Sequence, residues 1–344
     1  WSETELLGES LHDAIHFQHA DGSPYPAAEC ELLKARDERR TVRTLDDAFT
    51  RKDGSIVPVS CSSSPLLSGN SVHGIVVVFR DTTDETAERG RVQRELDALS
   101  WVGRIRDSLD EGRMNLYSQP IVPLNGGQPA EELLLRMVGP NGEVVPPGRF
   151  LPVAEKYGLI TEIDEWVIAQ AVRLAASGRR VQANLSAASM GRAELLPLIE
   201  HELRTSGAEP ANLVFEITET ALMHDIAGGE VFARALADIG CELAIDDFGT
   251  GFGSFTYVKR LPVHYLKIDL EFVIELIPNP ANQHVVKAIV NLAQGFGQKT
   301  IAEGVEDAET LELLREFGVD YAQGYHLGRP APLEDESMRA ARAG

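Results

Sequence analysis

The chain has 344 residues, enough for two domains of ordinary size. Hydrophobic residues make up 43% and charged residues 25%, a balance typical of globular proteins rather than of disordered or fibrous ones. The formal net charge is −21, so the chain lacks the basic surface that a general DNA- or RNA-binding protein, or a protein docked on an anionic membrane, requires. A phosphorylated substrate remains compatible with this charge if divalent cations lie between the two.

Three cysteines, Cys30, Cys61 and Cys241, are too few and too scattered for a disulfide framework or a zinc site, and we interpret them as small buried hydrophobic residues. The longest stretch without Asp, Glu, Lys or Arg covers residues 54–79, and polar residues interrupt it, so we predict no membrane segment. No signal peptide opens the chain, and we expect a cytoplasmic protein. Because the sequence starts at Trp1 without Met, we expect a fragment of a longer protein.

Residues 1 to about 84 combine short β-type runs with turn signals. Residues 51–55 read Arg-Lys-Asp-Gly-Ser, which is a turn sequence, and residues 56–60 continue as a strand pattern. A second, strongly β-branched run covers residues 72–79 and follows Gly69-Asn70. Two strands joined by a Gly-Asn turn are therefore predicted.

Residues 85 to about 112 form a polar, charge-mixed stretch without proline. Hydrophobic residues recur along it at spacings of three and four, which indicates one face of an amphipathic helix. These residues are Val92, Leu96, Leu99, Val102, Ile105 and Leu109. A helix packed on its own domain fits the pattern as well as a signalling linker or a dimer seam does, and both interpretations stay open at this point.

From residue 113 to about 335, strand-like runs alternate with helical patterns such as those of residues 161–176 and 283–295. The strand candidates are residues 115–122, 132–138, 180–185, 213–217, 241–245, 265–268, 299–302 and 321–326. Strands that alternate with helices favour a parallel sheet, and eight of them match an eight-stranded α/β barrel. A doubly wound open sheet is the structural alternative.

Polar residues gather near the ends of these strand candidates. They are Glu132, Asn184, Glu216, Glu219, Asp246, Asp247, Lys267, Asp269, Glu303, Glu306 and Gln323. In a barrel such side chains converge at the C-terminal mouth, where several unpaired carboxylates would repel one another unless cations were bound.

The candidate donors for a cation are all oxygen atoms, from Glu132, Asn184, Glu216, Asp246 and Asp247. Oxygen ligands without Cys or His select Mg²⁺ or Mn²⁺ over Zn²⁺. The adjacent Asp246-Asp247 pair could bridge two ions, an arrangement suited to two-metal phosphodiester hydrolysis.

Taken singly, these residues have simpler interpretations. An acid at a strand end is usually a helix N-cap or a surface charge. Lys267 alone would fit a solvated lysine or a Schiff-base lysine. The coincidence of polar residues at six successive strand ends favours a shared site.

Three further features carry less weight. The glycines in residues 249–253 lack dinucleotide-binding spacing, and the glycosylation pattern at residues 184–186 is accidental on a predicted barrel strand. His12, His16 and His19 cluster near the start of the chain. We interpret these histidines as solvated or core residues rather than as haem or metal ligands.

Residues 101–333 resemble the EAL-domain phosphodiesterases of bacteria, which act on the second messenger cyclic di-GMP. The motifs that carry the resemblance occur in the family's order. They are Glu132-Leu-Leu-Leu-Arg136, Asn184-Leu-Ser186, Glu216-Ile-Thr-Glu219, Asp246-Asp-Phe-Gly-Thr-Gly251, Leu266-Lys-Ile-Asp269, Ala302-Glu-Gly-Val-Glu306 and Gln323-Gly-Tyr325. The resemblance implies a TIM-like (β/α)8 barrel over residues 113–335 that hydrolyses cyclic di-GMP to linear pGpG in the bacterial cytoplasm.

The resemblance also implies a two-metal site for Mg²⁺ or Mn²⁺. Glu132, Asn184, Glu216 and Asp246 resemble the ligands of one ion, and Asp247 with Asp246 resembles the ligands of the second. We expect a homodimer with cyclic di-GMP as its substrate and no DNA or RNA polymer as a partner.

The remaining catalytic roles follow from the same resemblance. Lys267 would position or deprotonate the attacking water, and Glu303 would complete the metal and water network. Glu219 would hold the loop of residues 246–251 in its working position, and Asp269 would support the site.

Three residues are implied in substrate binding. Arg136 would contact a phosphate, Gln119 would line the guanine pocket, and Gln323 would support the site. The chain departs from the family pattern at residues 252–255, which read Phe-Gly-Ser-Phe where Tyr-Ser-Ser-Leu is commoner.

Residues 1–84 resemble the later part of a PAS sensor domain of α+β type. The resemblance rests on Lys52-Asp-Gly-Ser-Ile56, on the run to Val76-Val-Val-Phe-Arg-Asp81, and on the exit into a helix. It implies a sensor, truncated at its start, that regulates the barrel through a helical linker at residues 85–112. A short tail of residues 336–344 would follow the barrel.

Two alternatives to this function stay open. One is a catalytically silent EAL receptor that binds cyclic di-GMP and signals through protein contacts. The other is a Schiff-base barrel enzyme that uses Lys267. No cyclase domain of the Gly-Gly-Asp-Glu-Phe type precedes the barrel region in this sequence, so synthesis of cyclic di-GMP is not predicted.

Overall fold

The computed structural model describes residues 1–68, 71–250 and 258–333. The chain divides into two compact units, Trp1–Leu99 and Ser100–Gly344, which are described separately below. Within the described ranges, no helix combines the length and the apolar character needed to cross a bilayer.

The first unit is built on a three-stranded antiparallel sheet. Its strands β1 (Val42–Thr50), β2 (Ile56–Ser68) and β3 (Ser71–Asp81) are paired in that order. The sequence predicted β2 and β3; the Gly69-Asn70 turn between them lies outside the described residues. Strand β1 was not predicted, because charged residues interrupt its hydrophobic pattern.

Short helices cover this sheet and close a small core. They are α1 (Glu3–Leu6), α2 (Leu11–Ile15), η1 (Ala27–Glu29, a 3₁₀ helix) and α3 (Glu31–Glu38). The core contains Ile15, Cys30, Leu32, Phe49, Val57, Val59 and Cys61. Cys30 and Cys61 are both free thiols, and both belong to this core.

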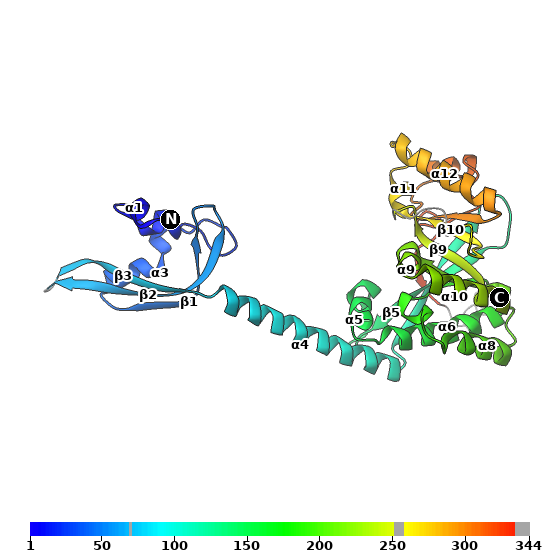
Figure 1. Cartoon of the computed structure of the whole chain (residues 1–344), viewed down its shortest axis with the longest axis horizontal. Coiled ribbons are helices and arrows are strands. Elements are labelled where there is room, and N and C mark those ends of the chain that lie inside the picture. Colours follow the sequence, from blue (N-terminus) through cyan, green and yellow to red (C-terminus); the bar gives the residue numbers. More distant parts are fainter. Residues whose placement is uncertain (69–70, 251–257, 334–344) are drawn as a thin grey trace. The chain divides into compact units, whose positions relative to one another are not determined.

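One continuous helix, α4 (Thr83–Asp110), follows the first sheet (Figure 1). Its hydrophobic stripe has two different environments. Ile105 is fully buried and Val102 and Leu109 pack against the barrel core, whereas Val92, Leu96 and Leu99 are 46%, 56% and 52% exposed. One half of the stripe therefore docks on the barrel, and the other half presents apolar surface to solvent.

The second unit is a closed eight-stranded barrel. Its strands are β4 (Met114–Pro123), β5 (Ala130–Val138), β7 (Val181–Asn184), β8 (Leu213–Thr218), β9 (Glu242–Phe248), β10 (Tyr265–Ile268), β11 (Lys299–Ala302) and β12 (Tyr321–Ala322). Strand β4 closes the barrel by pairing with both β5 and β12, which rules out the open sheet. The two-residue strands β6 (Val144–Val145) and β13 (Ala331–Pro332) pair with β5 and β4.

One strand departs from the predicted parallel arrangement. Strand β4 runs antiparallel to both of its barrel neighbours, whereas the other barrel pairs are parallel. The connection between β4 and β5 covers only residues 124–129, which is too short for a crossover helix. Gly126 and Gly127 in this connection have φ values of +90° and +132°, which suit a tight reversal of the chain.

Helices cover the outside of the barrel. They are α5 (Leu151–Lys156), α6 (Ile160–Ala176), α7 (Ala187–Met190), α8 (Leu195–Ser206), α9 (Glu219–His224), α10 (Ile226–Ile239), α11 (Leu270–Ile274), α12 (Pro280–Phe296) and α13 (Ala308–Glu316), with 3₁₀ helices η2 (Pro147–Arg149) and η3 (Pro210–Asn212). The helical patterns predicted at residues 161–176 and 283–295 correspond to α6 and α12. Along α6, for example, Ile163, Val167 and Ala171 are buried at a spacing of four, which fixes this face against the sheet.

Candidate active site

The interior of the barrel contains one mostly apolar layer of side chains, one from each strand. It consists of Ile121, Ala130, Gln182, Val214, Ala244, Tyr265, Ile301 and Tyr321. Since side chains alternate between the two faces of a strand, the residue two positions further on faces the same interior.

That step produces a second layer, and every member of it is polar. The layer consists of Gln119, Glu132, Asn184, Glu216, Asp246, Lys267, Glu303 and Gln323. On β4 the step runs backward from Ile121 to Gln119, because this strand is antiparallel. The alternation of side chains along the strands thus places eight polar side chains, one from each barrel strand, at one level of the barrel interior.

Lys267 lies at the centre of this polar layer and is fully buried. Its Nζ lies 2.7 Å from Glu216 Oε2, 2.8 Å from Glu303 Oε1 and 3.0 Å from Asp246 Oδ1. Glu132 Oε2 is 3.8 Å away. Burial alone would lower the pKa of Lys267, but these four carboxylates outweigh it and raise the pKa well above the ordinary value, so Lys267 is protonated.

Amide side chains hold Glu132 from its other sides. Asn184 Nδ2 donates to Glu132 Oε1 at 2.9 Å, and Gln323 Nε2 donates to Glu132 Oε2 at 2.6 Å. The same Gln323 amide lies 3.1 Å from Gln119 Oε1, and Gln119 in turn donates to the Gly328 carbonyl at 3.0 Å. The network connects strands β4, β5, β7 and β12 and fixes the orientation of one carboxylate.

The acids of the site outnumber its cation. Burial raises the pKa of Glu303 to about 7, and the charges of Asp246 and Glu132 add to this against the opposing effect of Lys267. Burial likewise raises the pKa of Glu216 well above its ordinary range. A single ammonium group cannot neutralise four carboxylates, so protons bind to this cluster near neutral pH.

Asp247 adds a further carboxylate beside this cluster. It has a φ of +53°, a left-handed conformation that is uncommon for a residue with a Cβ. Burial, the charge of Asp246 and the neighbouring Asp269 raise the pKa of Asp247 to about 6. Carboxylate oxygens of Asp246, Asp247 and Glu303 lie within 4.8 Å of one another.

The donor set fits divalent cations that prefer oxygen ligands. Glu216 Oε1 is buried without a hydrogen-bond partner, whereas Asp246 Oδ1 has the Lys267 ammonium at 3.0 Å. A buried carboxylate oxygen that accepts no hydrogen bond is costly, and a bound cation would satisfy it. Carboxylate and amide oxygens are the ligands that Mg²⁺ and Mn²⁺ prefer.

Glu219 contacts the backbone that follows the two aspartates. It is buried at the start of α9, and its Oε2 accepts a hydrogen bond of 3.0 Å from the Gly249 amide. Gly249 has a φ of +107°, and a Cβ there would lie 3.0 Å from the Phe272 ring, so glycine is required. The predicted departure at residues 252–255 lies outside the described residues.

Two of the predicted residues have other contacts as well. Asp269 is the N-cap of α11 and accepts a hydrogen bond of 2.6 Å from the Glu271 amide, the simpler role for an acid at a strand end. Arg136 is half-buried on β5; it donates to the Leu135 carbonyl at 2.8 Å and lies over the Tyr117 ring. The described contacts of Arg136 do not join it to the carboxylates.

A cavity of about 280 Å³ borders the polar layer at Gln119, Glu132, Glu303 and Gln323. Glu306, which was expected at the mouth of the barrel, also lines this cavity. The other lining residues were not predicted as site residues, and they are Leu270, Ile274, Gly304, Gly324 and Tyr325. Of these residues, Gly324 has a clear reason to be glycine, because a Cβ there would lie 2.1 Å from the Val305 carbonyl oxygen. A larger cavity of about 850 Å³ lies between β4 and α6, and none of the described residues that line it is an acid.

We expect Glu303→Gln to stabilise the protein in EDTA, and to do so more at about pH 8 than at about pH 5. The folded-state pKa of Glu303, about 7, exceeds its ordinary value of 4.5, so the folded protein binds this proton more tightly and loses stability as the pH rises between these values. Each pKa unit corresponds to roughly 1.4 kcal/mol, which limits the change in unfolding free energy to about 3 kcal/mol.

Urea unfolding at both pH values measures this difference. Glu200→Gln, at an exposed position on α8, is the control and should show no pH-dependent gain. A Glu303→Gln variant that is less stable than the wild type at the higher pH would contradict this account of the cluster.

Comparison with known proteins identifies relatives of both units. Residues 102–330 match the EAL domain family, and residues 2–84 match a PAS domain. The chain is 35% identical over 251 residues to the cyclic di-GMP phosphodiesterase PdeF of Escherichia coli, an alignment that covers 71% of this chain and 34% of the relative. It is 36% identical over 259 residues to the cyclic di-GMP phosphodiesterase NbdA of Pseudomonas aeruginosa, covering 72% and 33%. The chain thus spans about a third of the length of these relatives.

Two solved structures share the fold of the barrel. The PaMucR phosphodiesterase in its c-di-GMP complex superposes with a TM-score of 0.65 at 37% identity, covering 68% of this chain and 98% of that one. The FimX EAL domain from Pseudomonas aeruginosa bound to c-di-GMP gives a TM-score of 0.65 at 32% identity, covering 67% and 96%. With the match over residues 102–330, this chain belongs to the EAL domain family.

Proposed function

We propose that this chain hydrolyses cyclic di-GMP to linear pGpG with two divalent cations, Mg²⁺ or Mn²⁺. The observation that carries the proposal is the polar layer, in which four carboxylates surround one buried ammonium and Glu216 Oε1 is buried without a hydrogen-bond partner. Relatives named cyclic di-GMP phosphodiesterases support the choice of substrate.

In this proposal the protein provides ligands for both cations. Glu132, Asn184, Glu216 and Asp246 would hold one cation, and Asp247 with Asp246 would hold the other. When bound, such cations make water acidic enough to attack near neutral pH and offset the charge on phosphoryl oxygens. The cation ligands Glu132 and Asn184 are already joined by a hydrogen bond of 2.9 Å, so they are held in place before binding.

Lys267 would orient the attacking water as a hydrogen-bond donor. Its raised pKa keeps it protonated in this environment, which favours positioning over deprotonation of the water. The same protonation disfavours the Schiff-base alternative, because imine formation requires a neutral amine. Glu303, 2.8 Å from Lys267 Nζ, would complete the metal and water network.

The substrate would lie over the polar layer. Gln119 and Gln323 border the cavity of about 280 Å³ and would face a guanine base there, while Arg136 would turn from the Leu135 carbonyl to a phosphate. Glu219 would hold the backbone after Asp247 in position through the Gly249 amide, and Asp269 would support Asp247 from the start of α11.

We expect Glu132→Gln to lower turnover of cyclic di-GMP by at least about 100-fold, because it removes a charged ligand from the site. Chromatography of the products with Mg²⁺, with Mn²⁺ and with EDTA measures this, and EDTA should abolish pGpG formation by the wild type. Glu131→Gln is the matched control: it is the adjacent carboxylate, on the opposite face of β5, where it pairs with Arg179.

Retention of full turnover in Glu132→Gln would remove the metal assignment. Binding of cyclic di-GMP by the wild type without release of pGpG under any of these conditions would replace the proposed hydrolase with the silent receptor. Turnover that persists in EDTA would oppose the dependence on divalent cations.

We further propose that the PAS-like residues 1–84 regulate the barrel through α4. The helix is continuous from the end of the sheet in the first unit to Asp110, close in sequence to the first barrel strand (Figure 1). Deletion of residues 1–84 is expected to change turnover by the barrel, measured with the same product assay. Identical kinetic constants for the deleted and whole chains would contradict regulation.

We also propose a homodimer in which the exposed half of the α4 stripe packs against the same stripe of a second copy. Val92, Leu96 and Leu99 follow the spacing of four and three that is typical of a two-helix seam. Leu96→Glu is expected to halve the molecular mass measured by light scattering, while Gln93→Glu, at an exposed polar position of the same helix, is expected to leave the mass unchanged. A monomeric wild type would contradict the seam.

A further inference from the structure

Three potential metal ligands meet inside the first unit, far along the chain from the barrel residues. His12 lies in α2, His16 follows that helix, and Cys30 precedes α3. Their ligand atoms lie within 4.8 Å of one another, and all three residues are at least nine-tenths buried. The proposed function of the barrel does not use any of them.

The hydrogen bond of His12 determines which of its nitrogens can bind a metal. His12 Nε2 lies 2.8 Å from the Tyr25 carbonyl oxygen, which can only accept, so Nε2 carries the proton. The lone pair of the neutral ring is therefore on Nδ1. This atom is buried and has no hydrogen-bond partner, and His12 is only 4% exposed. An unsatisfied ring nitrogen in a protein core is costly unless a ligand occupies it.

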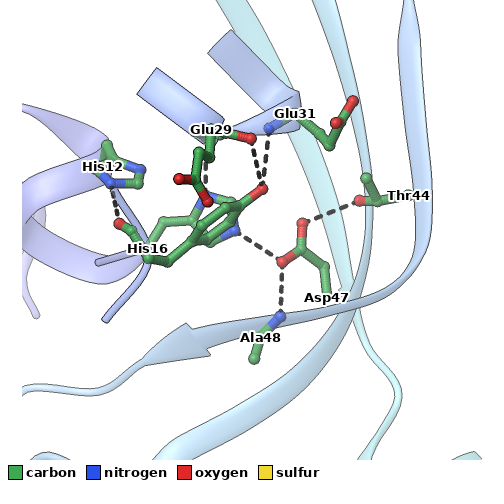
Figure 2. A network of polar contacts seen from close by, with 9 residues as sticks. His12, His16, Glu29, Glu31, Thr44, Asp47 and Ala48 are labelled. Carbon is green, nitrogen blue, oxygen red and sulfur yellow. Dashed lines mark hydrogen bonds and ion pairs between the residues drawn. The ribbon is translucent and has the colours of Figure 1, made fainter. Parts of the chain in front are cut away.

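A carboxylate binds Nε2 of His16 and leaves Nδ1 to face the cluster. This Nε2 lies 2.7 Å from Asp47 Oδ1, and Figure 2 shows Asp47 held in turn by the Ala48 amide and the Thr44 hydroxyl. His16 Nδ1 faces Cys30 Sγ at 3.3 Å, and a metal ion bound between them would displace the proton that these two atoms share. Metal-binding histidines typically donate their second N–H to a carboxylate or a backbone carbonyl, and His12 and His16 provide one example of each.

Cys30 is in a setting that favours the thiolate. It is the N-cap of α3, where free backbone N–H groups are available. Burial raises the pKa of the Cys30 thiol, but the contact with His16 outweighs burial and leaves the pKa below its ordinary value. Cys61, in the same core, lacks this setting, and burial raises the pKa of its thiol to about 11.

We propose that His12 Nδ1, His16 Nδ1 and Cys30 Sγ form a binding site for a thiophilic transition-metal ion of the Zn²⁺ class. Bond lengths of about 2.0–2.1 Å to nitrogen and 2.3 Å to sulfur in a tetrahedron separate N and S by roughly 3.5 Å, near the observed 3.3 Å. Two imidazoles and one thiolate select such ions over Mg²⁺ and Mn²⁺, the ions that suit the oxygen donors of the barrel.

Three protein ligands leave a fourth coordination position for water or a small exogenous ligand. His12 also lines a cavity of about 460 Å³ whose other walls include Leu11, Ile15, Phe49 and Phe79. A metal site in a protein core requires an entry path, and an ion would reach the cluster from this cavity at His12.

Cobalt binding to the whole chain tests the site, because a Co²⁺–thiolate bond gives a near-ultraviolet charge-transfer absorption that oxygen ligands do not. The titration is made in excess Mg²⁺ and without oxygen, so that the acidic barrel site is filled and the thiols stay reduced. We expect the absorption to saturate at one equivalent of Co²⁺ and to disappear on addition of one equivalent of Zn²⁺, which binds such sites more tightly than Co²⁺.

The variants identify the ligands. Cys30→Ser is expected to abolish the absorption, while Cys61→Ser, the matched control from the same core, is expected to retain it. His12→Gln should weaken Co²⁺ binding as a lost ligand does, and Asp47→Asn should weaken it roughly 10–100-fold through His16. Circular dichroism establishes that each variant is folded, and His12→Gln decides the matter if Cys30→Ser does not fold.

Failure of the wild type to develop the absorption would overturn the proposal. So would absorption that survives in Cys30→Ser, or absorption that depends on Cys61 instead. Unchanged affinity in both His12→Gln and Asp47→Asn would show that the histidines are core residues only.

Discussion

The barrel depends on the balance between one buried ammonium and the carboxylates around it. Lys267 is fully buried, and such a charge is tolerated only with close partners. Glu216, Glu303 and Asp246 lie within 3.0 Å of its Nζ. The positive charge of the lysine is therefore fully compensated, whereas the negative charges of the acids are not. The surplus of negative charge appears as raised carboxyl pKa values and as a buried oxygen of Glu216 without a hydrogen-bond partner. The protein thus retains an arrangement that costs stability, which is expected of residues that serve a functional site rather than folding.

Much of the barrel could be predicted from the sequence because its signals are local. Each strand candidate overlaps an observed strand, since short apolar runs between amphipathic helices are specific to a buried parallel sheet. The direction of β4 could have been predicted too, because residues 124–129 cannot hold a crossover helix and contain two consecutive glycines. That reversal explains why Gln119 belongs to the polar layer although it lies before Ile121 rather than after it.

Other parts of the molecule depend on contacts that no local pattern records. The contact of Glu219 with Gly249 joins residues thirty positions apart and was anticipated only through the family resemblance. His12 and His16 were interpreted as solvated or core residues and Cys30 as a small buried hydrophobic residue, because the cysteines are too few and too scattered for a familiar metal motif. What brings these residues together is the contact of His16, at the end of α2, with Cys30, at the start of α3, together with the position of Asp47 after an irregularity in β1. Tertiary structure alone supplies that information.

The reversed strand also decides where the barrel receives the chain that precedes it. In the register of β4 with β5, Met114 is opposite Met137, so β4 begins at the edge where β5 ends. A parallel first strand would begin at the N-terminal end of the barrel. Strand β4 begins at the opposite, C-terminal end, on the same side as the acids. Arg113 joins the start of β4 to the end of β5, because its carbonyl accepts a hydrogen bond from the Val138 amide and its guanidinium donates one to the Val138 carbonyl. A displacement arriving along α4 would therefore act first on the edge of the barrel that carries the acids.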